Sequence, residues 1–236
     1  MNSLTEIVNY GSRKIHSKVR NGTRKYVPTN LEGCKLYLPM EQKIFNLSAD
    51  HSGLNNHGTI YGATETDGKI NKGLYFDGVD DYVDCGNVID VTNKLTVIAW
   101  VKFPSDCYGP VVSKYESGDL RWHLWIDGNS RIICNIANKA ARVSITGLID
   151  TWVHLGMIYD GEQESQEDRL KLLINGEKIT LDFYYGTIPS SCPTINSNLY
   201  INKQSTYYGK MSIDELRVYN VAISEETVIA SYQQEL

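Results

Sequence analysis

The chain has 236 residues, of which 42% are hydrophobic, and its formal net charge at pH 7 is −5. This length and apolar content are ordinary for a folded globular protein with one large domain. The sequence contains no run of about 18 apolar residues, which excludes a membrane-spanning helix, and its first residues lack the apolar segment of a secretory signal peptide, so we expect synthesis in the cytoplasm without membrane insertion.

The first 31 residues differ from the rest of the chain in charge. They contain one acidic residue, Glu6, and a set of basic residues: Arg13, Lys14, Lys18, Arg20, Arg24 and Lys25. The segment shows no sustained strand or helix period and ends in "VPTN". We therefore predict a basic arm over residues 1–31 and one domain over residues 32–236. The arm either docks to an acidic partner surface or is a solvated tail, and the acidic remainder makes nucleic acid an unlikely ligand.

From Cys34 onward the chain is a series of short apolar segments separated by Gly, Asn and Asp, which is typical of an all-β protein. Residues 95–103, "LTVIAWVKF", are apolar almost throughout, as in a central strand that is buried on both faces. Hairpins are predicted over residues 120–138 and over 169–181, where Asn175 and Gly176 form the turn. Further strands are expected at 35–40, 57–62, 73–78, 81–86, 151–161, 198–203 and 207–220. A helix is predicted over 224–236, with Ser224 as its N-cap.

The cysteines are odd in number and widely spaced, and they form no C-x-x-C pair. They are Cys34, Cys85, Cys107, Cys134 and Cys192. We expect them to be reduced and mostly buried, without a disulfide framework or a zinc site.

The order of the segments resembles the laminin-G-like, concanavalin A-like jelly-roll family over residues 34–233. The resemblance rests on "DHSGLNNHG", "GKINKGLYFDGVDDYVDCG", "LTVIAWVK", "WVHLGMIYD", "LLINGE", "LYINK" and "YYGKMSIDELRVYNVAISEETVIASY", which follow one another as in that family. It implies a jelly-roll β-sandwich of two antiparallel sheets, each of about six or seven strands. It also implies a binding scaffold far more often than an enzyme.

Two groups of acidic residues are candidates for a metal site. Asp77, Asp80 and Asp81 lack the spacing of an EF-hand loop, so they are predicted to form the turn between two strands. The family resemblance implies instead a Ca²⁺ held by Asp50 and Asp214, with Gly53 or Asn56 offering carbonyl oxygens. In the alternative, Asp50 begins a local turn and Asp214 accepts hydrogen bonds from buried amides or pairs with Arg217.

A catalytic role is not expected. The glycosidases of this fold carry an E-x-D-x-x-E strand, and the nearest text here, "EQESQE", contains Glu162, Glu164 and Glu167. The residues between these glutamates are polar rather than apolar, which predicts a solvated loop without the environment that tunes a catalytic acid. Glycoside hydrolysis is therefore a distant alternative.

The hairpin at 120–138 offers a sugar-binding site. Alternation along "RWHLWID" places Arg121, His123 and Trp125 on one face and Trp122 on the other. An aromatic ring beside polar hydrogen-bonding groups suits a sugar. The alternative is that both tryptophans pack, one in the core and one under a loop. The aromatic loops at 183–186 and 206–209 are candidates for the rim of such a site.

These observations favour non-catalytic binding. We expect a virion-associated decoration, appendage or adhesion protein of a phage, with a glycan-binding domain facing host polysaccharide and residues 1–31 attached to other virion or surface proteins. Homo-oligomers are expected by analogy with such proteins. The alternative is a lectin-like module of a secreted or cell-surface bacterial protein. Either way the protein would act on a virion or at an extracellular surface.

Overall fold

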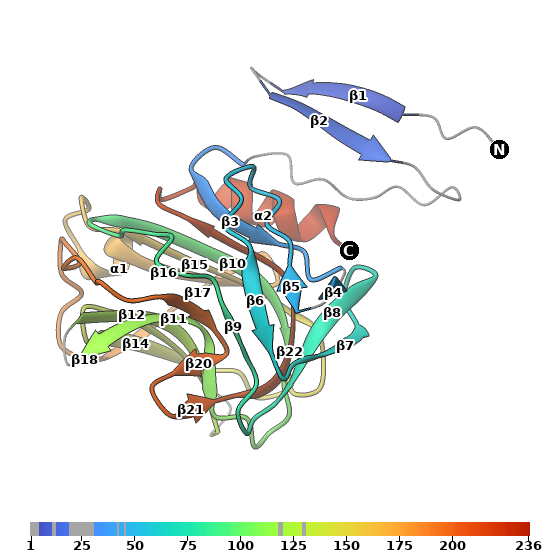
Figure 1. Ribbon diagram of the computed structural model, residues 1–236. Coiled ribbons are helices and arrows are strands. Elements are labelled where there is room, and N and C mark those ends of the chain that lie inside the picture. The colour runs from blue at the N-terminus through green and yellow to red at the C-terminus, as the bar shows by residue number, and fades with distance from the viewer. Residues whose placement is uncertain are drawn as a thin grey trace.

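Two large antiparallel sheets organise the protein, which we describe from a computed structural model (Figure 1). The structure describes residues 5–10, 13–18, 31–41, 43–44, 46–117, 120–128 and 131–236. Alternating side chains let each sheet bury one face against the other, and the two inner faces form one hydrophobic core. This is the predicted jelly-roll sandwich.

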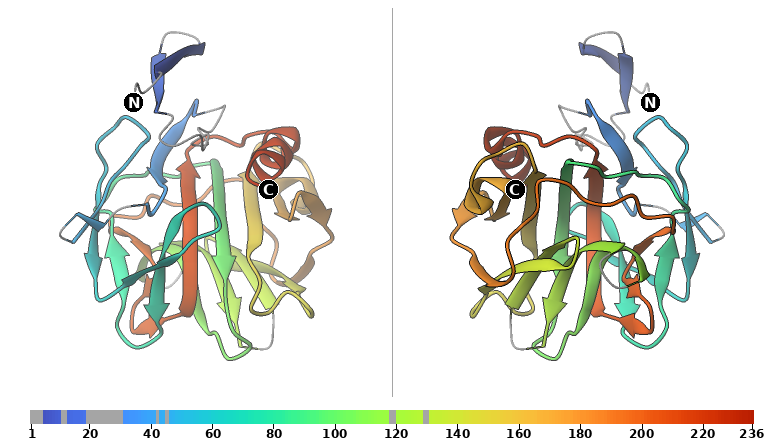
Figure 2. Two further views of the ribbon diagram at one scale, coloured as in Figure 1. Left: turned by 90° about the vertical axis from the view of Figure 1, so that its right-hand side faces the viewer. Right: turned by 90° about the vertical axis from the view of Figure 1, so that its left-hand side faces the viewer.

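The first sheet has eight strands in the described residues. In spatial order they are β17 (Glu177–Ile179), β16 (Leu170–Ile174), β15 (Val153–Asp160), β10 (Lys94–Lys102), β22 (Lys210–Tyr219), β8 (Lys72–Asp77) and β7 (Thr64–Asp67), with β3 (Cys34–Leu38) also paired to β22. β22 runs between β10 and β8 (Figure 2). β10 is buried along nearly its whole length, as its apolar sequence predicts.

The second sheet has ten strands in the described residues. In spatial order they are β18 (Asp182–Tyr185), β14 (Lys139–Ser144), β13 (Arg131–Ile136), β12 (Leu120–Asp127), β11 (Gly109–Ser117), β19 (Leu199–Ile201), β9 (Tyr82–Asp84), β6 (Gly58–Tyr61), β5 (Leu47–Ser48) and β4 (Lys43–Ile44). The alternation predicted for β12 is confirmed, because Trp122, Leu124 and Ile126 lie in the core between the sheets.

On the outer face of the eight-stranded sheet lies α2 (Glu225–Gln234), which packs against β15 and β16 (Figure 1). Its N-cap is Ser224, whose hydroxyl accepts a hydrogen bond from the Thr227 amide, as predicted. The helix approaches β15 closely at Gly156, where an added Cβ would lie 2.4 Å from Val228 Cγ1. A second cluster of buried apolar side chains therefore seals this face.

Several elements differ from the sequence-based expectation. The sheets contain more strands than the expected six or seven, because short strands such as β4 and β5 carry too few residues to show a period. Two further short strands, β20 (Lys203–Gln204) and β21 (Tyr207–Tyr208), form a separate hairpin. A second, one-turn helix, α1 (Gln166–Arg169), follows the N-cap Ser165 within the predicted loop. In the arm, β1 (Thr5–Tyr10) and β2 (Arg13–Lys18) pair as an antiparallel hairpin where no regular element was expected.

Three smaller expectations are confirmed. The Asn175–Gly176 turn has positive φ at both positions, as a tight hairpin turn requires. All five cysteines are unpaired and buried, and burial raises the pKa of their thiols. Among the described residues, no helix is both long and apolar enough to cross a membrane.

Candidate functional site

A cavity of about 330 Å³ opens on the outer face of the ten-stranded sheet. We call it the aromatic pocket. Its lining is Tyr108, Arg121, His123, Trp125, Ile133, Asn135, Ala140, Tyr184, Tyr185, Gln204 and Tyr207. The volume falls within the range of small-molecule sites. The lining combines aromatic rings with a few polar groups and contains no carboxyl group.

The floor of the aromatic pocket follows from strand alternation. Because Trp122, Leu124 and Ile126 point into the core, His123 and Trp125 point to the outer face of β12. The cross-strand neighbours in β13 are Asn135 opposite His123 and Ile133 opposite Trp125. Local sequence thus suffices to place the floor.

One wall is built by the β20–β21 hairpin, which folds over β11. Ser113 Oγ on β11 donates a 2.6 Å hydrogen bond to the Lys203 carbonyl, and His123 Nδ1 lies 2.7 Å from Gln204 Oε1. Tyr207 then reaches the floor, with its ring centroid 5.6 Å from that of Trp125 in an edge-on contact. Tyr108 makes a similar contact with Trp125 at 5.2 Å.

The opposite wall is the edge strand β18, which pairs with β14 and carries Tyr184 and Tyr185. Arg142 lies over the Tyr184 ring, 4.4 Å from its centroid, and its Nε donates a 2.9 Å hydrogen bond to Asp182. Lys139 lies 5.6 Å from the Tyr185 centroid. Three strands, β12 to β14, lie between the two walls and form the floor.

Burial controls the charge of the pocket. His123 is buried, and the loss of solvation lowers its pKa to about 4, which the hydrogen bond to Gln204 only partly offsets. The imidazole is therefore neutral near pH 7. Because an amide oxygen only accepts, the bond to Gln204 places the proton on Nδ1 and leaves Nε2 as an acceptor. Arg121 is then the charged side chain of the lining.

The structure brings together the three predicted sugar-binding residues, Arg121, His123 and Trp125, in one lining. The two tryptophans are placed as in the alternative given above, with Trp122 in the core and Trp125 under loops. Trp125 is 6% exposed, because Tyr108 and Tyr207 cover it, so the indole forms part of the floor rather than an open platform. Both aromatic loops contribute to the rim as expected. The polar groups Asn135 and Gln204 and the ring of Tyr108 were not predicted from the sequence.

The residues proposed for calcium are held by protein donors. The Asp50 carboxylate accepts hydrogen bonds from the Tyr37, Ser52 and Asn56 amides and from the Ser52 hydroxyl, at 2.7 to 2.9 Å. A carboxylate has about four acceptor positions, and these donors occupy them. The His57 ring accepts from the Asp50 amide, which is the loop role expected of that histidine.

Asp214 lies elsewhere, on β22, and its carboxylate accepts from the Ile70 and Glu215 amides. Burial raises the pKa of Asp214 to about 8, which favours its neutral form near pH 7. Gly53 is exposed in the loop after Asp50, and the Asn56 side chain donates to the Lys35 carbonyl. In this arrangement both carboxylates accept their hydrogen bonds from protein groups. Calcium binding by this set stays a prediction, which thermal melts with calcium and with a chelator would check.

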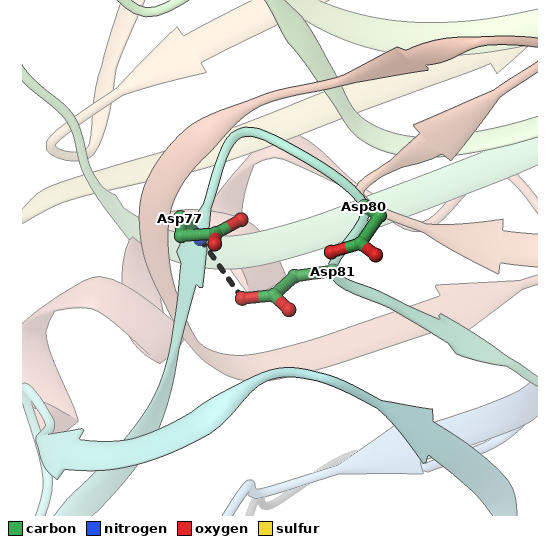
Figure 3. Close-up of side chains that lie close together, drawn as sticks. All are labelled: Asp77, Asp80 and Asp81. Atoms are coloured by element: carbon green, nitrogen blue, oxygen red, sulfur yellow. Dashed lines mark hydrogen bonds between the residues drawn. The ribbon is translucent and has the colours of Figure 1, made fainter.

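The aspartates of the β8–β9 turn form a compact group. Asp77, Asp80 and Asp81 have carboxylate oxygens within 4.8 Å of one another (Figure 3). The Asp81 carboxylate accepts from the Asp77 amide at 3.0 Å, and the Asp77 carboxylate accepts from Val79 at 2.8 Å. These bonds close the turn, with Gly78 at φ 85°. The predicted turn role is confirmed.

The glutamates considered for catalysis do not meet. Glu162, Glu164 and Glu167 are all exposed; the first two lie on the segment that leads into α1, and Glu167 lies in α1 itself. Glu162 pairs with Lys94 at 2.6 Å. The segment is the solvated region that its polar sequence predicts.

Comparisons with known proteins agree with the architecture. The family model described as the concanavalin A-like lectin/glucanases superfamily matches residues 77–229. A comparison with curated protein sequences gives no match.

Three solved structures show the similarity of fold. The binding domain of Paraclostridial Mosquitocidal Protein 1 has a TM-score of 0.63 at 15% identity, over 86% of this chain and 52% of that chain. Domain 4 of the extracellular arabinanase AbnA from Geobacillus stearothermophilus, in complex with arabinotriose, has a TM-score of 0.60 at 18% identity, over 84% and 97%. Trypanosoma rangeli sialidase has a TM-score of 0.59 at 14% identity, over 84% and 32%. This chain thus spans about half of the toxin domain and nearly the whole of the arabinanase domain.

Proposed function

We propose, from the premise that the chain belongs to the concanavalin A-like lectin/glucanase superfamily, that this protein binds glycans without transforming them and that the aromatic pocket is the binding site. The observation that carries the proposal is the convergence of aromatic rings and polar groups from distant parts of the chain on one cavity.

The chemistry of the lining suits a saccharide. The CH-bearing face of a sugar ring packs against aromatic rings, here the half-exposed tyrosines of the two walls. The hydroxyl groups of the sugar need fixed donors and acceptors, which the neutral His123, Asn135 and Arg121 offer. The His123–Gln204 bond holds one of these groups in place before the ligand arrives, which reduces the entropy lost on binding.

Two further observations support a binding role. The lining has no pair of carboxyl groups, which glycoside hydrolysis by the usual acid–base route requires. A domain of similar fold and size, domain 4 of the arabinanase, holds arabinotriose in its crystal structure. The likeness supports a saccharide ligand here, while the identity of that ligand depends on the side chains of this chain.

A glycan array with the full chain tests the proposal. Bound glycans are then titrated against Tyr207→Ala, with Tyr61→Ala as the matched control. Tyr207 lies on the β20–β21 hairpin and Tyr61 on β6, and both are about half exposed, at 50% and 45%, but Tyr61 lies outside the pocket and stacks on Tyr82. Loss of a central aromatic contact is expected to weaken binding about tenfold in the pocket variant alone. A blank array, or equal losses in both variants, would reject this assignment.

We also propose that the domain works as the outward-facing part of a larger assembly, such as a phage appendage, with residues 1–31 as its attachment. Support comes from the concentration of basic residues in that segment and from the separate β1–β2 sheet, whose strands pair only with each other in the described residues. Deleting residues 1–31 is expected to leave glycan affinity unchanged and to abolish co-sedimentation with assembly partners. Unchanged co-sedimentation would contradict the attachment role.

A further inference from the structure

The charged side chain of the aromatic pocket has no acidic partner among the described residues. Arg121 stands near the start of β12, half-buried, on the same face as His123 and Trp125. It donates from Nη2 to the side-chain oxygen of Asn138, an uncharged amide. Its Nε is buried and has no hydrogen-bond partner.

The other described arginines are satisfied differently. Arg131 pairs with Asp127 and Arg142 with Asp182. Arg217 pairs with two buried glutamates, at 2.5 and 2.6 Å. Arg169 donates to the carbonyls of residues 163 and 188. Among the arginines of residues 31–236, Arg121 is thus the one whose guanidinium has neither a described carboxylate nor a backbone acceptor at hand.

An unpaired guanidinium in a half-buried position is costly, because burial removes water without supplying a counter-charge. A guanidinium donates hydrogen bonds from a planar, positively charged group. The lining supplies no acid to balance it, although the chain as a whole is acidic. The cavity therefore offers a positive charge to its ligand beside aromatic walls.

We propose that the aromatic pocket selects sugars that carry an anionic group and that this group, a carboxylate or a sulfate, pairs with the guanidinium of Arg121. A planar fork of N–H donors matches either oxyanion and gives shorter, stronger bonds than a neutral hydroxyl would. The inference rests on the proposed function, since it names the class of ligand for the same pocket. Uronic-acid polymers are the simplest sugars of this class.

The test compares polysaccharides that differ only in charge. Pectate, alginate and hyaluronate are each tested in two forms, one with ionised carboxylates and one that is carboxyl-reduced and neutral. A neutral polysaccharide to which sulfate groups have been added is tested as well. At least one anionic form is expected to bind the full chain at least tenfold more tightly than its neutral counterpart, with an affinity that falls as salt is added. The carboxylate and sulfate arms identify which oxyanion the pocket prefers.

Three variants locate the preference. Arg121→Gln is expected to remove the difference between the charged and neutral forms, and Arg121→Lys to keep part of it, because the charge remains and the fork is lost. Arg169→Gln removes a guanidinium at α1, outside the lining, and this variant should bind as the parent protein does. Thermal melts of each variant report whether the fold is intact.

The outcomes separate the two proposals. Equal or stronger binding of neutral forms, with Tyr207→Ala still harmful, would overturn the anionic preference and leave glycan binding in place. A charge preference that survives Arg121→Gln would also overturn it. Absence of binding to every polymer and to the glycan array would reject glycan binding and the preference together.

Discussion

Replacing Arg217 by Met should be among the most destabilising single changes in this fold. Arg217 is 1% exposed, and its guanidinium donates to Glu215, Glu235 and Ser231 at 2.5, 2.6 and 2.8 Å. The variant keeps the apolar stem but leaves two buried carboxylates without their cation. Breaking a buried ion pair from one side costs about 3 to 5 kcal/mol. That is about a fifth or more of the stability of a typical domain of about 5 to 15 kcal/mol.

The loss should depend on pH in a defined direction. Burial raises the pKa of Glu215 even with Arg217 beside it, and without the guanidinium that pKa rises further. Below the pKa of about 4.3 that a glutamate has in the unfolded chain, such a carboxyl is protonated and its burial costs little. As pH rises toward the higher pKa of the folded state, the loss of folding stability grows. The difference in unfolding free energy between parent and Arg217→Met should therefore be small near pH 4 and reach its full size above pH 7.

Urea unfolding followed by tryptophan fluorescence measures this difference, since Trp100 Nε1 donates to Glu235 at 2.5 Å and reports on the same cluster. Lys72→Met is the matched control. Lys72 pairs with Asp67 at 2.9 Å, but both side chains are exposed and solvent screens their attraction, so little or no loss is expected. A loss below about 1 kcal/mol for Arg217→Met at pH 7, or an equal loss at pH 4 and pH 7, would refute the reasoning.

Three further predictions concern α2 and the pocket. Ser224→Ala removes the N-cap bond to the Thr227 amide and should lower the unfolding free energy by about 1 kcal/mol, read as a lower urea midpoint with an unchanged slope. Gly156→Ala should lower the unfolding free energy by about 1 to 3 kcal/mol, because the added Cβ would lie 2.4 Å from Val228, and a second change, Val228→Ala, should relieve the clash. A double variant whose loss of stability is no smaller than the sum of the two single losses would contradict this contact. Because the pKa of His123 is lowered from 6.5 to about 4 in the folded protein, the contribution of this residue to stability falls as pH drops from about 6.5 toward 4. Glycan affinity should therefore stay constant from pH 8 to 5.5 and decline near pH 4, which a titration of affinity against pH checks.

The floor of the pocket could be predicted because strand alternation is local. In "RWHLWID" the period of two assigns Trp122 to the core and His123 and Trp125 to the opposite face, and the structure confirms both. The same logic identified β10 from its unbroken apolar run and α2 from its N-cap. In each case the deciding signal lies within a few consecutive residues.

The walls could not be predicted because they depend on contacts between distant segments. Gln204 meets His123 across 81 residues of sequence, through a hairpin whose strands have two residues each. Tyr108 lies outside any strand, before β11, and becomes part of the pocket only through its packing on Trp125. The burial of Trp125 follows from these same contacts, and it matches the alternative in which one tryptophan packs in the core and the other under a loop.

The positions of the exposed aromatic rings indicate which face of the sandwich binds a ligand. α2 and a buried cluster occupy the outer face of the eight-stranded sheet, so that face is already used for stability. The described tyrosines that are exposed all belong to the outer side of the ten-stranded sheet or its bordering loops: Tyr61, Tyr108, Tyr184, Tyr185 and Tyr207. Four of these five line the aromatic pocket. Large rings left in solvent contribute little to folding, and gathered around one cavity they form the kind of surface that marks a binding site. The outer face of the ten-stranded sheet thus leaves apolar rings exposed, whereas the outer face of the eight-stranded sheet is buried, and such exposed rings are what the proposed glycan site requires.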